Sequence, residues 1–474
     1  MHFHWLVLRE WWRRSPGKSD EASAARPCRQ DQPLDFFADD RGADRGAVAT
    51  HCAAITLRRP TAGGDLQMLR IQKSLQSAGA QCVEGPSPAD GSSSKSRDLP
   101  DALSRQVYCI LGIPIDLITM PGVLRRIEAA AACDAPFTLS TPNLNFLVTS
   151  QSDAEFRETL LLSDLCPPDG APILWIAQLL GVPLKQRIAG SDLFDALKLS
   201  SNPLKIFLFG GAQGVATAAA RALNNGPGSL RCVGTFNPGF CSIDEMSRSD
   251  IIDRVNSSGA EFLVASLGAR KGQLWLQRNW DRLRIPIRAH LGATLNFQAG
   301  TIKRAPSVMC KWGLEWLWRI KEEPRLCWRY LHDGTVLLRL LFTHVLPLAI
   351  QSWCLKLNRH RRGQDFSVSQ VHDDEDVTVF FSGRATARQV ERVIPVLRES
   401  VVTGKQLKID FSTSQEIDAR FLGLLLMLRK TLKARGAGFT LTGLSPGLER
   451  VFRLNGLDYL LSECRQPSGL LALR

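Results

Sequence analysis

Short apolar runs alternate with helical patterns of apolar residues between residue 107 and about residue 302. An uninterrupted apolar run is typical of a strand covered on both faces, whereas apolar residues three or four apart are typical of a helix packed on one side. By these patterns, strands are expected at 107–111, 138–139, 206–209 and 262–266. Helices are expected at 119–132, 215–223 and about 274–283.

This alternation of strand and helix is typical of α/β proteins with a parallel sheet. The sequence therefore predicts a Rossmann-like, doubly wound core over residues 105–302. In such sheets ligands bind beyond the carboxyl ends of the strands. Polar residues that directly follow a predicted strand are therefore the first candidates for a functional site.

The pattern changes at 303–363, where helical segments mix tryptophan with arginine. This segment has twelve Lys and Arg against four Asp and Glu, and it holds five of the eleven tryptophans. Indole rings and cationic side chains together suit the headgroup level of a bilayer. We expect a basic helical appendage that contacts an anionic inner-membrane surface. A lid that packs its tryptophans on the core is the alternative, and both roles are compatible.

A third unit follows a linker expected at 364–374. Strands are expected at 377–381, 407–411 and 439–444, and helices at 387–401, 420–434 and 448–454. The sequence therefore predicts a second, small α/β domain at 375–474, which is an ordinary domain size.

Signals for export or membrane insertion are weak in this sequence. The first residues form no convincing signal peptide, and no run of eighteen uncharged apolar residues occurs, so a spanning helix is not expected. Residues 1–104 lack a sustained period, and we expect either a disordered extension or an over-extended reading frame, with Met68 as a later start.

The 474 residues carry 59 Lys and Arg against 46 Asp and Glu, a net charge of +13, which predicts an anionic partner. Because more than half of this excess lies in the Trp-rich appendage and no nucleic-acid motif accompanies it, a nucleic acid is not expected. The twelve cysteines form no CxxC pair, so the spacing of zinc ligands is absent and we expect no metal site. Because the chain is long and rich in core residues, we expect reduced thiols in the cytoplasm. No cofactor is expected.

Three polar clusters follow predicted strands. The first holds Thr141, Asn143 and Asn145 around a proline, and its side chains could grip a nucleotide or a sugar hydroxyl; an ordinary turn with a helix cap is the alternative. The second is Asp169, held stiffly between two prolines and a glycine, where a carboxylate could act as general base or simply form an Asx turn.

The third cluster is the glycine pair Gly210 and Gly211 between a strand and a helix. Glycines at this point let a diphosphate approach the backbone N–H groups that begin the helix. The spacing matches neither of the common phosphate-binding patterns, so a tight turn without a ligand is equally compatible.

Ordered motifs over about 110–330 resemble the WecB/TagA/CpsF glycosyltransferases, glycosyltransferase family 26. They are Thr141-Pro142-Asn143, Leu162-Ser163-Asp164, Pro168-Asp169-Gly170, Gln186-Arg187-Ile188-Ala189-Gly190-Ser191-Asp192, Leu208-Phe209-Gly210-Gly211, Leu267-Gly268-Ala269, Gly292-Ala293, Ala299-Gly300, Lys303-Arg304-Ala305-Pro306, Gly313-Leu314-Glu315-Trp316-Leu317, Arg319, Glu323-Pro324-Arg325 and Arg329-Tyr330.

The resemblance implies an inverting, metal-independent transfer of an N-acetylmannosamine-type or related hexose. The donor would be a UDP-sugar and the acceptor an undecaprenyl-diphosphate-linked sugar, in exopolysaccharide or other surface-polysaccharide synthesis. Asp169 would be the general base, and Thr141, Asn143 and Arg187 would line the site. The basic tail would close over the site and touch the membrane, with four arginines near the leaving diphosphate: Arg304, Arg319, Arg325 and Arg329.

One departure concerns the segment after Leu267-Gly268, where the family usually has Pro-Lys-Gln-Glu and this chain has Arg270-Lys271-Gly272-Gln273. Either Gln273 takes over substrate binding through a shift in register, or sugar recognition has changed, or activity is reduced. The last option supports a different function, a membrane scaffold that recruits polysaccharide machinery.

The C-terminal unit resembles a STAS domain through three stretches. They are Leu407-Lys408-Ile409-Asp410-Phe411-Ser412, Ile417-Asp418 with Leu422-Gly423-Leu424-Leu425, and Gly443-Leu444-Ser445-Pro446. STAS regulators usually carry a phosphorylatable residue after the aspartate, where this chain has Ala419 and Arg420. We therefore expect a protein-interaction module without that switch, and a homo-oligomer is a further partner that the sequence leaves open.

Overall fold

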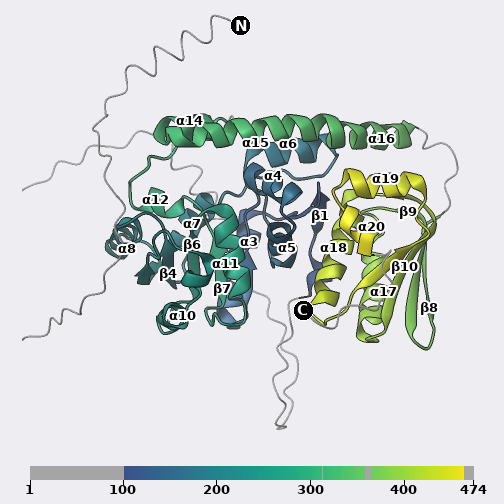
Figure 1. The fold of residues 1–474 in the computed structure, drawn as a ribbon, viewed down its shortest axis with the longest axis horizontal. Coiled ribbons are helices and arrows are strands. Elements are labelled where there is room, and N and C mark those ends of the chain that lie inside the picture. The colour runs from purple at the N-terminus through teal and green to yellow at the C-terminus, as the bar shows by residue number, and fades with distance from the viewer. Residues whose placement is uncertain (1–100, 312, 358–364, 464–474) are drawn as a thin grey trace, which may run out of the picture. The chain divides into compact units, whose positions relative to one another are not determined.

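The computed structural model describes residues 101–311, 313–357 and 365–463. Most of the extension expected at 1–104 lies outside these ranges. Its last residues form the short helix η1 (Ala102–Ser104), capped by the side chain of Asp101. The other described residues form the predicted α/β core, the helical appendage and the small α/β domain (Figure 1).

The core is a five-stranded, wholly parallel sheet in the order β3-β7-β6-β4-β5. Its strands are β3 (Phe137–Leu139), β4 (Leu204–Gly210), β5 (Leu230–Phe236), β6 (Phe262–Ser266) and β7 (Ile287–His290). The predicted Rossmann-like fold class is therefore confirmed. Strands β5 and β7 are additions to the strands expected from the sequence.

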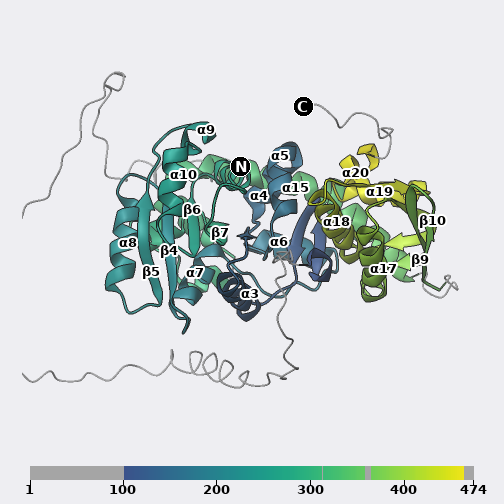
Figure 2. The ribbon, with the colours of Figure 1, turned by 90° about the horizontal axis from the view of Figure 1, so that it is seen from below.

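Helices cover both faces of this sheet because alternate residues of β4 and β6 point to opposite sides (Figure 2). One face packs against α3 (Met120–Ala132), α7 (Gly190–Lys198), α8 (Val215–Asn225) and α12 (Thr294–Gln298). The other packs against α9 (Ile243–Met246), α10 (Ser249–Asn256) and α11 (Ala269–Arg278).

The strand expected at 107–111 lies outside the parallel sheet. It forms β1 (Val107–Ile110), which pairs antiparallel with β2 (Ile113–Asp116). The two-residue turn has positive φ at Leu111 and Gly112, as a tight hairpin turn of the mirror-image type requires. Three helices pack beside this hairpin: α4 (Leu144–Ser152), α5 (Ala154–Leu162) and α6 (Ala171–Leu179).

The second α/β domain has a four-stranded sheet in the order β11-β10-β9-β8. Its strands are β8 (Ser367–His372), β9 (Asp376–Ala385), β10 (Gln406–Ile417) and β11 (Phe439–Thr442). Its helices are α17 (Val390–Val402), α18 (Ala419–Lys433), α19 (Pro446–Leu454) and α20 (Asp458–Glu463). Strand β8 falls within the linker expected at 364–374, which corrects that boundary: an antiparallel ladder with β9 orders this polar edge strand.

The appendage is helical, as predicted. It contains α13 (Ser307–Lys311), α14 (Glu315–Glu322), η2 (Pro324–Leu326), α15 (Cys327–Leu340), the π-helical turn η3 (Leu341–Val345) and α16 (Leu346–Leu357). From α15 to α16 the helix is continuous, and it runs over α4, α6 and α19 (Figure 1). The wide turn η3 lies just before Pro347, which lacks an N–H to donate.

This continuity changes one expectation from the sequence. Pro324–Leu355, 32 residues long, is apolar enough by length and composition to cross a membrane, although the sequence predicted no such helix. Arg339, His344 and Pro347 break the apolar run in the sequence, but the helix continues through all three.

Candidate active site

Two loops meet at the edge strand β3. The segment 163–166 lies beside β3, with a parallel bridge between Leu139 and Leu165. Beyond it, the backbone N–H of Asp169 donates to the carbonyl of Pro142 over 2.9 Å. The first and second predicted clusters are therefore brought together, although more than twenty residues of chain separate them.

Asn143 links the two loops through its side chain. Its Oδ1 accepts a hydrogen bond from the N–H of Phe146 over 3.2 Å and caps α4. This bond fixes the amide so that its NH₂ group can donate to the carboxylate of Asp169. The same side chain therefore makes the helix cap, which was the alternative from the sequence, and the contact with Asp169; binding of a nucleotide or a sugar hydroxyl by Asn143 stays a prediction.

Asp169 is a partly buried carboxylate with an unusual pKa. Burial raises its pKa to about 7, and the charge of Glu315 adds to this rise. Arg187, the hydrogen bond from Asn143 and the charge of Arg319 act in the opposite direction. A carboxylate with a pKa close to the working pH suits a general base.

Arg187 ties the site to the appendage. One guanidinium nitrogen lies 2.5 Å from the Glu315 carboxylate on α14, and another lies 3.3 Å from Asp192 on α7. Glu315 thus faces both Arg187 and Asp169 from the appendage. Glu315 was not predicted as a site residue, although it stands within the motif Gly313-Leu314-Glu315-Trp316-Leu317.

The four predicted appendage arginines lie in different surroundings. Arg304 pairs with Asp192 and Asp195 of α7, so it anchors the start of the appendage. Arg319 donates to Glu323 over 2.8 Å and lies 5.6 Å from the Phe297 ring centre. Its Nε is buried and has no hydrogen-bond partner within the part of the chain that the structure describes. Arg325 and Arg329 are exposed.

A cleft of about 530 Å³ opens near these loops, beside the carboxyl end of β6. It is lined by Asn145, Thr149, Ile243, Gly268, Ala269, Arg270, Lys271 and Arg329. The first turn of α11 and three cations face it, which suits an anionic ligand. Asn145 and Arg329 were predicted; Arg270 and Lys271 were not, although two adjacent cations after a strand–glycine turn were a signal for them.

Gly210 and Gly211 have positive φ values of 96° and 84°. A Cβ atom at Gly210 would lie 2.5 Å from the carbonyl oxygen of Ser266, and the Gly211 N–H donates to this same oxygen over 2.7 Å. Close packing between β4 and β6 therefore accounts for Gly210, and the positive φ of the turn accounts for Gly211. This favours the alternative from the sequence, a tight turn without a ligand.

Gln273 does not line the cleft, contrary to the sequence prediction. It is 1 % exposed, because α11 turns this position toward the core, and its Oε1 accepts from Ser140 Oγ over 3.2 Å. Its Nε2 has no partner among the described residues. Thr141 is also buried, beside the start of α7.

Gly272 explains the other half of the departure. A Cβ atom there would lie 2.2 Å from Cδ2 of His290, whose ring is held by the Leu267 carbonyl over 2.6 Å. The imidazole therefore occupies the space that a side chain at position 272 would need.

Comparison with known proteins gives two family matches. The model of the glycosyl transferase WecG/TagA/CpsF family matches residues 108–349, and that of the Mlab-type STAS domain matches residues 368–462.

Within residues 101–311, 313–357 and 365–463, no group of three or more His, Cys, Asp or Glu side chains could hold a metal ion.

One curated relative and one solved structure are similar to parts of the chain. The N-acetylglucosaminyldiphosphoundecaprenol N-acetyl-beta-D-mannosaminyltransferase of Bacillus spizizenii is 25% identical over 188 residues, which cover 39% of this chain and 70% of the relative. The phosphorylated form of the Bacillus cell fate determinant SpoIIAA is 21% identical, with 20% of this chain and 87% of that chain covered and a TM-score of 0.18.

Proposed function

Because this glycosyltransferase belongs to the WecG/TagA/CpsF family and carries a STAS domain, we propose that it transfers an N-acetylmannosamine-type hexose from a UDP-sugar. The acceptor is a sugar, of the N-acetylglucosamine type, linked through a diphosphate to undecaprenol. The activity named for the Bacillus spizizenii relative supports both substrates. We place the reaction in exopolysaccharide or other surface-polysaccharide synthesis.

The observation that carries this proposal is the carboxylate of Asp169, whose pKa is raised to about 7 beside Asn143 and Arg187. Asp169 takes the proton of the acceptor hydroxyl as the acceptor oxygen attacks the anomeric carbon of the donor. The bond from that carbon to the UDP oxygen breaks on the opposite side, so the configuration inverts. The electron pair leaves with UDP.

Cations stabilise the departing UDP in this proposal. Lys271 and Arg329 line the cleft at the start of α11, and together they can bind the diphosphate without a metal ion. Arg319 approaches from the appendage, with a buried Nε that lacks a partner within the described ranges. The appendage would thus complete the site when the substrates bind.

The reaction is tested by UDP release from purified protein with a synthetic lipid-diphosphate sugar and a panel of UDP-sugars. Since a general base acts in its ionised form, kcat is expected to rise with pH and to level off above the pKa of Asp169, about 7. A kcat that falls through this range contradicts the assignment. Binding of UDP-sugars without turnover would instead support the scaffold alternative.

We place the enzyme in the cytoplasm, peripheral on the inner membrane, because one side of the appendage is apolar and exposed. Trp328 is 80 % exposed and Phe342 is 69 % exposed, at helical spacing along one continuous helix. The other exposed apolar residues of this stripe are Leu331, Leu338, Leu346, Ile350 and Trp353. An apolar stripe flanked by arginines suits the interface of an anionic bilayer.

Replacing Phe342 and Trp353 together by serine is expected to weaken binding to anionic vesicles by at least about ten-fold, because two large apolar side chains no longer enter the bilayer. Co-sedimentation with vesicles of anionic and zwitterionic lipid measures this. Phe240→Ser, an exposed aromatic outside the appendage, is the matched control and is expected to bind as the wild type does. Equal binding by both variants would contradict membrane contact through this stripe.

A further inference from the structure

We propose that the STAS domain is fixed against the transferase core and that Lys430 on α18 is a positioning residue for the segment that ends at Asp169. This inference rests on the proposed function, since it concerns the placement of the proposed base. It differs from the expectation of a free protein-interaction module, because the partner of this face of the STAS domain is the transferase core of the same chain.

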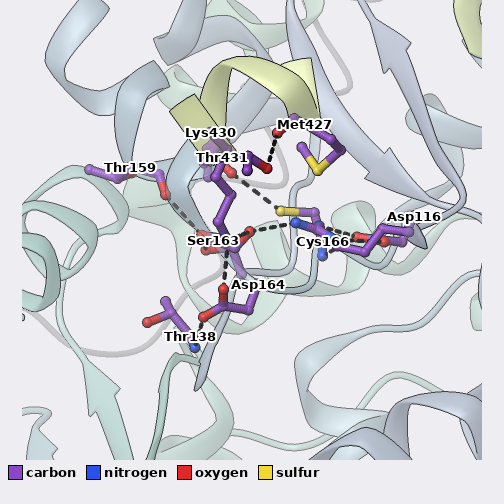
Figure 3. Close-up of polar contacts among 12 residues, drawn as sticks. Asp116, Thr138, Thr159, Ser163, Asp164, Cys166, Met427, Lys430 and Thr431 are labelled. Carbon is purple, nitrogen blue, oxygen red and sulfur yellow. Dashed lines mark hydrogen bonds and ion pairs between the residues drawn. The ribbon is translucent and has the colours of Figure 1, made fainter. Parts of the chain in front are cut away.

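Lys430 reaches from the STAS domain into the transferase core (Figure 3). Its Nζ donates to the Ser163 carbonyl over 2.9 Å and to Asp164 Oδ1 over 2.5 Å. The other carboxylate oxygen of Asp164 accepts from the N–H of Thr138 on β3 over 2.8 Å. Asp164 therefore joins the STAS domain to the edge of the parallel sheet.

Arg105 and Asp116, at the two ends of the hairpin, hold the same segment as Lys430 does. Arg105 donates to the Ser163 carbonyl over 2.8 Å and pairs with Asp116 on β2 over 2.7 Å. Asp116 Oδ2 in turn accepts from the N–H of Cys166 over 2.6 Å (Figure 3). Two cations and two carboxylates, all largely or fully buried, thus fix residues 163–166. Losing one member leaves its partner's charge buried and unpaired.

The segment from Cys166 to Asp169 has little freedom to absorb a shift. Pro167 and Pro168 restrict the backbone, and the carbonyl of Pro168 accepts from the N–H of Ile188 over 2.8 Å. A displacement at Asp164 is therefore carried along the chain to Asp169. Asp169 lies only three residues after Cys166, the last residue of this segment that Asp116 holds. A misplacement of about 1 Å of a catalytic group can lower the rate about a hundred-fold.

The docking of α18 fixes where Lys430 points. Residues 421–428 of this helix are apolar and buried: one side packs on the STAS sheet and the other against the hairpin β1–β2. Arg420, one of the two residues at the place where STAS regulators carry a phosphorylatable residue, donates to the Val107 carbonyl over 3.1 Å. The start of α18 is thus bound to strand β1 of the same chain.

The test compares Lys430→Met with Lys433→Met in the full-length protein. Lys433 lies on the same helix and pairs across the same interface with Glu158 on α5 over 2.7 Å, but it does not touch the segment 163–169. Lys430→Met is expected to lower kcat about ten- to a hundred-fold with an almost unchanged KM for the UDP-sugar. Lys433→Met is expected to keep wild-type kcat, and Lys430→Arg to recover most of the lost rate.

Two further measurements keep a folding defect apart from a positioning effect. The double variant Lys430→Met with Asp164→Asn leaves no unpaired buried charge, and it is expected to melt near the wild-type temperature while kcat stays low. Equal kcat for Lys430→Met and Lys433→Met, or no recovery with Lys430→Arg, would overturn the inference alone. A wild-type protein that releases no UDP would overturn the proposed function and this inference together.

Discussion

Asp169→Asn is expected to lower kcat by about 10²- to 10⁴-fold, the contribution typical of a general base. Asparagine has nearly the same shape and can still interact with Asn143, but it cannot take up the proton of the acceptor hydroxyl. The donor should bind almost as before, so KM for the UDP-sugar should change little. Initial rates of UDP release at pH 8, where the wild-type carboxylate is ionised, measure this effect.

A surface carboxylate provides the matched control. Asp250 is exposed and pairs with Arg248 on the surface, so Asp250→Asn removes one negative charge far from the proposed chemistry. This variant is expected to turn over at the wild-type rate. An Asp169→Asn protein with more than about a tenth of wild-type kcat would show that Asp169 is not the base.

The stability of Asp169→Asn gives an independent check on the environment of this carboxylate. The folded pKa is raised to about 7 from the ordinary value of 3.8, so the folded state holds the proton more tightly than the unfolded state does. Wild-type stability should therefore fall as pH rises from about 4 through about 7, and asparagine removes this loss. The melting temperature of the variant relative to wild type should be higher at pH 8 than at pH 4.5.

In the parallel sheet the sequence predicted β4 and β6 from uninterrupted apolar runs, and it missed β7, where polar residues break such a run for a structural reason. Strand β7 contains Arg288 and His290, both buried. The cost of burying the guanidinium of Arg288 is offset by the hydrogen bonds that it donates to the carbonyls of Trp280, Leu283 and Ile285. These carbonyls come close to Arg288 only in the folded protein. The pattern of apolar and polar residues in 287–290 therefore does not reveal that the segment is a buried strand.

A residue of the candidate site could be predicted where a short segment of sequence fixes the local backbone around it. Asp169 stands out because prolines precede it and a glycine follows it. The pairing of Arg187 with Glu315, 128 residues apart, depends on how the appendage folds back, which no local pattern encodes. Gln273 was misplaced for the same reason, since the turn of α11 decides which side faces the cleft.

The sequence of helix α18 indicates a second buried surface, which was not predicted. Its apolar residues surround the helix, and a helix of this kind is buried on all sides. A STAS domain alone would cover only one side. The pattern thus indicates a second buried surface, but apolar residues do not specify their partner, and the hairpin emerges only from the structure.

Gly423→Ala tests this surface, because we expect it to lower the free energy of unfolding where alanine in a helix would ordinarily raise it. Alanine in place of a mid-helix glycine stabilises a helix by about 1 kcal/mol when nothing is near it. At Gly423, however, a Cβ atom would lie 2.1 Å from the Val107 carbonyl oxygen and 2.6 Å from its carbon, so α18 must move away from β1. We expect a net destabilisation of about 1–3 kcal/mol, measured by urea denaturation.

The matched control is Gly334→Ala in α15, another mid-helix glycine, where a Cβ atom would meet nothing within 4 Å. The same substitution should therefore raise the urea midpoint at Gly334 and lower it at Gly423. Because a shift of α18 also moves Lys430, Gly423→Ala should lower kcat as Lys430→Met does, whereas Gly334→Ala should not. A raised midpoint for both variants would mean that the STAS domain does not dock on β1 as closely as this structure has it.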